Sequence, residues 1–355
     1  MAKRIAVIPG EDAAPEAMGA AVELIDRMGL GLEWTYPLVG EPARAKGLGP
    51  FPAEAKAEID AADATFFGAT SGASTRALFY LRWGKQTYAN VRPTRWSPGF
   101  ATPLKDPTGV DFVIVRENLE DSYVFLEGEL TDLEPLDLTS PTVRAKAHEL
   151  GPGRYALKVI TEAGSERVIR FAFELARRRK AAGHPGRLTA SAKWNMLPKT
   201  DGLFIEAARR LAGDYPDIEF ETLIVDDFAH RLVLRPQRFD VIVLPNLYGD
   251  ILSDAAAGLA GGLGLAASGC YGEKYAYFES AHGTAPDIAG QGIINPTASL
   301  LAGAMMLEHL GLANAGARLR QAIERVYAEG RVLTPDQGGS ASTRAFADAV
   351  FSALA

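Results

Sequence analysis

The most informative stretch of the chain reads VIVLPNLYGDILSDAAAGL over residues 241–259. Its first four residues, Val241 to Leu244, form an apolar run of the kind found in strands that are covered on both faces of a sheet. Pro245 ends that run, and the residues after it are compatible with a helix. A strand followed directly by a helix is the repeating unit of α/β proteins, so this stretch favours an α/β fold.

The rest of the chain repeats this alternation. Apolar runs typical of buried strands occur at 5–8, 64–69 and 112–115, and helical spacing occurs at 15–28, 166–179, 300–310 and 317–327. Two stretches interrupt it: residues 93–109 hold four prolines and two glycines, and residues 127–153 are irregular. The first of these predicts a linker or a crossover between domains.

Composition limits the classes of function. The 355 residues fit two domains or one large folding unit. With 37 basic and 44 acidic side chains, the net charge of −7 argues against nucleic acid as a partner but permits small anions. Cys270 is the single cysteine, which excludes an internal disulfide and favours a reducing compartment. Apolar runs are too short for a membrane helix or a signal-peptide core, so we expect a cytoplasmic protein that binds no membrane.

Paired carboxylates suggest a metal site. If the stretch 246–269 is helical, Asp250 and Asp254 lie on one face about one turn apart. Like charges at that spacing repel, but Mg²⁺ or Mn²⁺ would reverse the sign because these cations prefer oxygen ligands. Asp226 and Asp227 follow the apolar run 223–225, a common site position in α/β proteins. The alternatives are a solvated acidic helix start for the first pair and a turn or helix cap for the second.

Arginines near apolar runs suggest an anionic substrate. Arg82, Arg92 and Arg116 together suit a di- or tricarboxylic acid, because a guanidinium can donate two hydrogen bonds to one carboxylate. Taken singly, each fits a surface ion pair equally well. Lys193 and Tyr123 are candidate proton-transfer groups. Their alternatives are an exposed lysine and a half-buried core tyrosine.

A loop at 279–298 is dense in Gly, Pro, Asn and Asp, as in a ligand-binding turn segment or an ordinary long loop. It contains neither GxGxxG nor the P-loop pattern. With the other motifs, in this order, it resembles the β-decarboxylating dehydrogenases, which include isocitrate, homoisocitrate, 3-isopropylmalate, tartrate and D-malate dehydrogenases. The matching motifs are YANVRP (88–93), VIVREN (113–118), AKWN (192–195), IVDDFAHRLV (224–233), NLYGDILSD (246–254) and HGTAPDIAG (282–290).

The resemblance implies a two-domain isopropylmalate-dehydrogenase-like fold of the α/β class. A central mixed sheet flanked by helices is expected, with a cleft between the domains and a cofactor site that is not of the Rossmann type. The first domain would comprise residues 1–97 and 259–355 and bind the cofactor. The second, residues 98–258, would carry the metal and substrate site and form a homodimer through an arm at about 127–153.

The resemblance also implies a role for each motif residue. Metal ligands would be Asp226, Asp250 and Asp254, and substrate contacts would come from Arg82, Arg92, Arg116 and Asn195. Proton transfer would fall to Tyr123 and Lys193. The cofactor site would use Glu279, His282, Gly283, Thr284, Ala285, Asp287, Ile288 and Asn295. In such enzymes the active site is shared across the dimer, so Lys193 and Asp226 are expected to come from the neighbouring subunit.

The reaction implied is oxidation and decarboxylation of a 2-hydroxy acid that carries a 3-carboxylate. NAD is expected as the cofactor, because Asp287 would accept hydrogen bonds from the adenosine ribose and repel a 2′-phosphate. An isocitrate- or homoisocitrate-like acid is the first expectation. 3-Isopropylmalate, tartrate, D-malate or an unusual acid of a specialised pathway is the alternative within the class. A non-catalytic regulatory paralogue is the alternative outside it.

The chain departs from the family pattern in two places. Residues 10–16 lack two glycines of the usual GDGIGPE, which leaves that backbone less freedom. The second departure is the segment 68–83, which in relatives faces the C3 substituent of the substrate. Arg76 is expected to bind an anionic substituent there, with Phe79, Tyr80 and Trp83 close by. Alternatively, Arg76 points to solvent and the aromatic side chains belong to the core.

Overall fold

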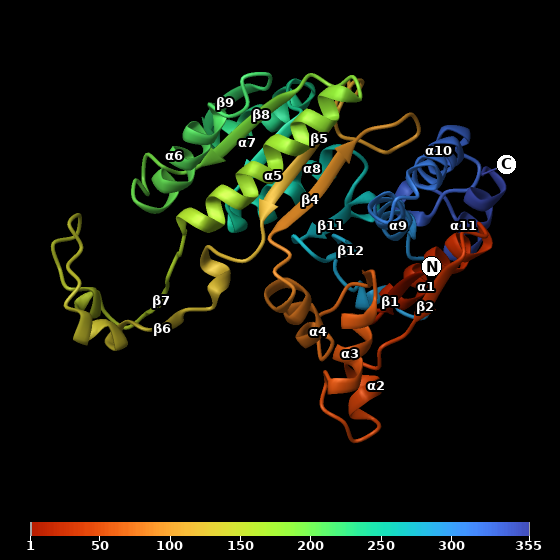
Figure 1. The fold of residues 1–355 in the computed structure, drawn as a ribbon, viewed down its shortest axis with the longest axis horizontal. Helices are drawn as coiled ribbons and strands as arrows, with labels where there is room; N and C mark the ends of the chain where they lie inside the picture. Colours follow the sequence, from red (N-terminus) through yellow and green to blue (C-terminus); the bar gives the residue numbers. More distant parts are fainter. Residues whose placement is uncertain (1, 355) are drawn as a thin grey trace.

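A computed structural model describes residues 2–354. Its centre is a 10-stranded mixed sheet with the order β2-β1-β3-β12-β11-β4-β5-β10-β8-β9 (Figure 1). The strands are β1 (Lys3–Ile8), β2 (Leu32–Thr35), β3 (Ala64–Phe67), β4 (Ala89–Arg95), β5 (Asp111–Glu117), β8 (Arg187–Ala192), β9 (Glu219–Ile224), β10 (Val241–Leu244), β11 (Ala267–Tyr271) and β12 (Ala276–Ser280). The predicted α/β class and mixed sheet are confirmed.

Helices cover this sheet on both faces, which explains why its strands read as continuous apolar runs. They are α1 (Ala14–Arg27), α2 (Glu41–Arg44), α3 (Ala53–Ala61), α4 (Thr75–Phe79), α5 (Glu162–Ala181), α6 (Thr200–Ala212), α7 (Val225–Leu234), α8 (Asn246–Leu259), α9 (Thr297–His309), α10 (Ala313–Glu329) and α11 (Thr343–Ser352). Every helix and strand expected from periodicity is present, although most boundaries differ by a few residues. No helix among the described residues is long and apolar enough to cross a membrane.

Two parallel halves of the sheet meet at antiparallel strands. Strands β2, β1, β3 and β12 are parallel neighbours, as are β5, β10, β8 and β9. Between them, β11 and β4 are antiparallel to both neighbours. The boundary expected at residue 97 therefore falls between two strands that are hydrogen-bonded to each other.

Only part of the proline-rich stretch 93–109 forms a connection, because its first three residues belong to β4. Pro93 lies inside β4, opposite Val113, and the strand continues to Arg95. Proline is tolerated there because β11 pairs with β4 only as far as Val91, so the other side of β4 is an open edge at Pro93. Composition alone could not indicate where the neighbouring strand ends.

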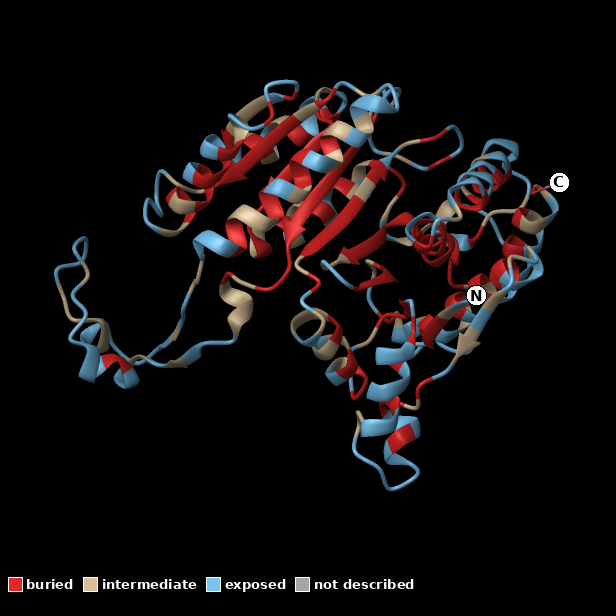
Figure 2. Ribbon diagram, in the orientation of Figure 1, coloured by how far each residue is buried: buried red, intermediate tan, exposed pale blue. Residues whose placement is uncertain are grey.

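The irregular stretch 127–153 forms an arm that extends away from the body of the molecule (Figures 1 and 2). It begins and ends with a small antiparallel pair, β6 (Glu127–Glu129) and β7 (Arg154–Ala156). Several of its apolar side chains are exposed, including Leu136 and Val143. The expected boundaries agree closely with this segment, and its role in a dimer stays a prediction.

Candidate active site

A cavity of about 290 Å³ lies where the two halves of the sheet meet. Its lining comes from the ends of β3, β5 and β12, from the middle of β4, from α8, from the turn that carries Tyr123 and from the segment around α4. The lining residues are Phe67, Ala69, Thr70, Leu78, Arg82, Arg92, Arg116, Tyr123, Asp250, Asp254, Glu279, Ser280, Ala281 and His282. A larger cavity of about 470 Å³ between α5, α9 and α10 contains none of the expected site residues, so the smaller one is the candidate site.

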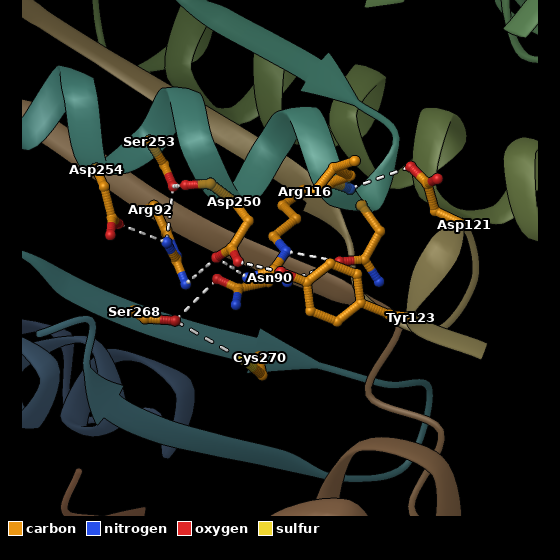
Figure 3. Close-up of polar contacts among 12 residues, drawn as sticks. Asn90, Arg92, Arg116, Asp121, Tyr123, Asp250, Ser253, Asp254, Ser268 and Cys270 are labelled. Carbon is orange, nitrogen blue, oxygen red and sulfur yellow. Dashed lines mark hydrogen bonds and ion pairs between the residues drawn. The ribbon is translucent and has the colours of Figure 1, made fainter. Parts of the chain in front are cut away.

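Arg116 stands at the end of β5 and is almost completely buried. Its Nε and Nη2 donate to Asn246 Oδ1 at 2.9 and 2.7 Å, and its Nη1 pairs with the Asp250 carboxylate (Figure 3). Burial and, after it, the nearby Arg92 cation lower the pKa of Arg116 to about 10. The guanidinium remains charged at neutral pH and presents a fixed cation to the cavity.

Arg92, on β4, joins both carboxylates of α8. Its Nη1 donates to Ser253 Oγ at 2.7 Å and to Asp254 Oδ1 at 2.9 Å, and its Nη2 lies 3.3 Å from Asp250 Oδ1. Burial alone would raise the pKa of Asp250, but Arg116 and Arg92 hold that pKa below its usual value. Burial raises the pKa of Asp254, against the pull of Arg92. The predicted helix and the shared face of its two aspartates are both present.

Tyr123 reaches the same carboxylate from a short helical turn, Ser122–Val124. Its hydroxyl donates to Asp250 Oδ2 at 2.5 Å, and the Arg116 guanidinium lies 5.0 Å from its ring. Burial and the Asp250 carboxylate both raise the pKa of Tyr123, so its proton is retained at neutral pH. The turn is held to α8 because Asp121 accepts a hydrogen bond from the Leu247 backbone at 3.1 Å.

Arg82 occupies the opposite wall. It lies in a π-helical turn, Tyr80–Gly84, that continues α4. Its Nε donates to Tyr277 Oη at 3.2 Å, and Nη2 lies 4.0 Å from Glu279 Oε1. Tyr277 and Glu279 are two residues apart on β12 and so face the same side of the sheet. Burial raises the pKa of Glu279, although Arg82 opposes that shift.

Three positioning side chains were missed by sequence reasoning: Asn246, Ser253 and Tyr277. Asn246 and Ser253 flank the aspartates on α8, so their motif could have indicated them. Tyr277 is 195 residues from Arg82 in sequence, and only the strand order brings the two together. These neutral partners orient the arginines without cancelling their charge.

The cavity has polar side-chain atoms that no described residue satisfies. Thr70 Oγ1, Arg92 Nε and His282 Nε2 are buried and have no hydrogen-bond partner among residues 2–354. Buried polar groups are normally paired, so unpartnered atoms around one cavity indicate a polar ligand. The oxygen-only pair Asp250 and Asp254 likewise fits a hard divalent cation such as Mg²⁺ or Mn²⁺.

The third expected metal ligand lies elsewhere. Asp226, in the first turn of α7, has an exposed side chain and pairs with Lys193 Nζ at 2.5 Å. That contact lowers the pKa of Asp226. Neither residue lines the cavity, nor does Asn195, which is also exposed. Among the described residues no three acidic, histidine or cysteine side chains gather as a metal site. Two of the three predicted ligands, Asp250 and Asp254, therefore lie together in one chain, and both the metal site and its sharing across a dimer stay predictions.

The expected cofactor segment lies beside the cavity. His282 and Glu279 line it, whereas Asp287 is exposed on the adjoining loop. Asn295 is buried and donates to Tyr327 at 3.1 Å and to Asp336 at 2.9 Å. The remaining residues of this set, Gly283, Thr284, Ala285 and Ile288, form the loop between them.

The altered loop 10–16 holds this segment in place. Glu16 accepts hydrogen bonds from the Gly290 and Gly292 backbones at 2.6 and 2.7 Å. Glu11 accepts three more from the backbone of residues 71–74. Asp12 adopts a left-handed conformation with φ of 55°, which aspartate tolerates better than most residues. The loss of glycine therefore leaves the loop intact, with Asp12 in a conformation that glycine would adopt more easily.

Arg76 does not line the cavity. Its side chain is exposed, and no hydrogen bond or ion pair joins that side chain to another described residue. Leu78 and Arg82 do line the cavity, and Arg76 is two residues before Leu78, about 200° around a helix. The alternative in which Arg76 points to solvent describes its position here. The other alternative, aromatic side chains in the core, does not hold for Phe79, which is 40% exposed.

Known proteins resemble this chain over its whole length. The family model described as Isocitrate/isopropylmalate dehydrogenase matches residues 4–350. An isocitrate/homoisocitrate dehydrogenase from Thermus thermophilus is 41% identical over 361 residues, covering 100% of this chain and 99% of that protein. A 3-isopropylmalate dehydrogenase from Archaeoglobus fulgidus is 39% identical, with 99% of each covered.

Two further comparisons bear on the cofactor and the fold. The mitochondrial alpha subunit of an NAD isocitrate dehydrogenase from Macaca fascicularis is 37% identical, with 98% of this chain and 94% of that protein covered. The crystal structure of isocitrate dehydrogenase from Methylococcus capsulatus matches with a TM-score of 0.85 and 38% identity over 99% of each chain.

Proposed function

This chain belongs to the isocitrate/isopropylmalate dehydrogenase family, and from that premise we propose an NAD-dependent, divalent-metal-dependent oxidative decarboxylase. Its substrate would be a small 2-hydroxy acid with a 3-carboxylate. The observation that carries the proposal is the cavity in which Arg82, Arg92, Arg116, Tyr123 and the α8 carboxylates converge. The NAD-type relative and the exposed Asp287 support NAD rather than NADP.

The residues of the cavity divide the work. Arg82, Arg92 and Arg116 hold the substrate carboxylates and fix the orientation of C2 and C3. A divalent cation bound at Asp250 and Asp254 would lower the pKa of the 2-hydroxyl and stabilise negative charge that develops during decarboxylation. NAD would accept the hydride from C2. Tyr123, which keeps its proton at neutral pH, would protonate C3 after carbon dioxide leaves.

Lys193 would remove the hydroxyl proton of the substrate in the partner's site. We propose a homodimer in which Lys193, Asn195 and Asp226 of one subunit complete the cavity of the other. In support, all three lie outside the cavity of their own chain, and Lys193 and Asp226 already contact each other. The buried single cysteine, Cys270, suits the proposed cytoplasmic location.

NADH formation with a panel of 2-hydroxy acids tests the reaction. Isocitrate, homoisocitrate, 3-isopropylmalate, tartrate and D-malate would each be assayed with Mn²⁺ and then with a chelator. We expect at least one acid to give NADH and carbon dioxide in equal amounts, and the signal to disappear with the chelator. Activity that survives chelation would overturn the metal requirement. Silence with every acid, although NAD still binds, would overturn the proposed oxidation.

Complementation tests the shared site. Tyr123→Phe and Lys193→Met chains are each expected to keep at most about a hundredth of wild-type activity as homodimers. Co-expression would produce mixed dimers with one intact site, giving about a quarter of wild-type activity for random two-fold assembly. Activity confined to the wild-type chain, with no recovery on mixing, would place Lys193 outside the partner's site.

A further inference from the structure

We propose that the C3 substituent of the substrate is a bulky apolar group, with an aromatic ring as the best fit, received by Phe79, Trp83 and Phe125. We call these three side chains the aromatic rim. Their ring centroids lie 5.2 Å (Phe79–Trp83), 5.6 Å (Phe79–Phe125) and 5.8 Å (Trp83–Phe125) apart. The inference rests on the proposed function, because it names the substituent on a substrate of that reaction.

The rim adjoins the cavity through chain neighbours on two sides. Phe79 and Trp83 each follow a residue that lines the cavity, Leu78 and Arg82 respectively. Phe125 follows Tyr123 by two residues and ends the same short turn, with a left-handed φ of 56°. The turn that positions the Tyr123 hydroxyl against Asp250 therefore also positions the Phe125 ring in the rim.

Two of the three cavity arginines lie at the end of the cavity away from the rim. Arg92 and Arg116 are held there by Ser253, Asn246 and the aspartates of α8, where they would meet the carboxylates at C1 and C3. The third, Arg82, is on the rim's side and is held by Tyr277 and Glu279. A substrate anchored by Arg92 and Arg116 would extend its C3 substituent past Arg82 towards Leu78 and the apolar rim.

An anionic substituent would meet no unpaired cation in the cavity on this side. Arg82 is held by Tyr277 and Glu279. Arg76, one turn before Phe79, is exposed and outside the cavity lining. The one hydrogen-bond donor among the rim side chains, the indole N–H of Trp83, already donates to the Leu119 carbonyl at 3.0 Å. A carboxylate set against three rings would lose hydration without compensation. An aryl or branched alkyl group would instead cover them and gain ring-to-ring contacts.

The exposure of the rim fits a surface that is covered by a ligand. Phe79 is 40% exposed and Phe125 is 58% exposed, although both belong to a cluster of large rings beside a polar cavity. Contiguous apolar surface of this kind on a folded protein commonly marks a binding site. A substrate whose apolar group reached the rim would bury it at the moment of binding.

A series of 3-substituted malates that differ only in the C3 group tests the inference. We would measure kcat/KM from NADH formation with 3-benzylmalate, 3-isopropylmalate, isocitrate, homoisocitrate and D-malate under identical Mn²⁺ and NAD. We expect 3-benzylmalate to exceed isocitrate by at least about tenfold, the scale on which apolar pockets discriminate. A higher value for isocitrate or homoisocitrate would overturn this inference and leave the proposed function standing. No turnover of any acid would overturn both.

Variants of the rim locate the effect. Phe79→Ala and Phe125→Ala should each lower kcat/KM for 3-benzylmalate about tenfold, mainly through KM, while D-malate, which has no C3 group, is unaffected. Both side chains are partly exposed, so the variants are expected to fold. Tyr36→Ala is the matched control, since Tyr36 is an aromatic side chain that is 57% exposed outside this site. Unchanged benzylmalate kinetics in both rim variants would overturn the inference, as would an isocitrate activity that Arg76→Ala removes.

Discussion

The polar end of the cavity and the aromatic rim are built in opposite ways. Arg116 and Arg92 come from neighbouring strands, are buried, and are paired with the carboxylates of one long helix. Phe79 and Phe125 come from short helical turns, one π-helical in its continuation and one ending in a left-handed residue, and they are exposed. With the proposed roles, reaction chemistry would be fixed by residues on the sheet and α8, whereas substrate choice would depend on short segments that can change without disturbing the sheet.

The largest effect is expected at the polar end, from Asp250→Asn. The change removes the charge that pairs with Arg116 and Arg92 and would remove a metal ligand. Losing the group that would bind the cation and orient both arginines should lower kcat/KM on the order of 10³-fold, the scale of several kcal/mol of electrostatic stabilisation in the transition state. Steady-state NADH assays would measure the loss, and circular dichroism would show whether the fold persists. Wild-type activity in a folded Asp250→Asn protein would contradict the assignment of Asp250 as a metal ligand. It would also contradict the view that the polar end of the cavity carries the reaction chemistry.

Tyr123→Phe removes the hydroxyl of Tyr123 but preserves the turn that also carries Phe125, so it tests the role of the hydroxyl alone. We expect kcat to fall about 10²-fold, the scale of a lost proton donor, while KM for the substrate stays nearly constant. The ring and the backbone of the turn are preserved, so the rim should be unaffected. A change in KM that depends on the C3 substituent would show that the whole turn shifts. The polar end and the aromatic rim would then not act independently.

Phe79→Arg would place in the aromatic rim the kind of side chain that forms the polar end of the cavity. A guanidinium in the rim offers two hydrogen bonds to a carboxylate and removes an apolar contact. We expect the ratio of kcat/KM for isocitrate over 3-isopropylmalate to rise about tenfold. Phe79→Leu is the control, because it keeps an apolar side chain and should leave the ratio near the wild-type value. An equal ratio in both variants would mean that Phe79 does not meet the C3 group.

The smallest expected effect is on stability, and it again belongs to the polar end. Glu117 follows Arg116 on β5, and burial raises its pKa from 4.5 to about 7. The folded protein therefore keeps a proton between these values that the unfolded chain releases. Its contribution to stability is complete below pH 4.5 and is lost as pH rises through about 7. Melting temperatures between pH 5 and 8 should fall less in Glu117→Gln than in wild type; parallel curves would contradict the shift.

Sequence patterns predicted the helices and strands that carry this site better than the side chains that hydrogen-bond its arginines. The spacing of Asp250 and Asp254 required only a helix, and α8 is one. Arg82, Arg92 and Arg116 are brought together as the family resemblance implied. Their orientation depends on side chains far away in sequence, which no local pattern reports.

The direction of side chains around α4 could not be predicted for a related reason. A regular helix has a fixed angle per residue, but this one changes to a π-helical turn at Tyr80. Which side of the helix faces the cavity is therefore set by packing. Likewise, the pairing of β8 with β9 brings the residues that follow them, Lys193 and Asp226, together across 33 residues. No pattern within either segment contains that information.

The antiparallel pairing of β4 with β5 has a consequence for how the chain folds. The two functional halves meet along backbone hydrogen bonds from Ala89–Glu117 to Arg95–Asp111, without a flexible joint in the sheet. A gene fragment encoding 98–258 alone would leave β5 as a bare edge, ready to pair with another copy and aggregate. We therefore expect that neither half folds as an independent unit. Heating the intact chain should melt both in one cooperative transition.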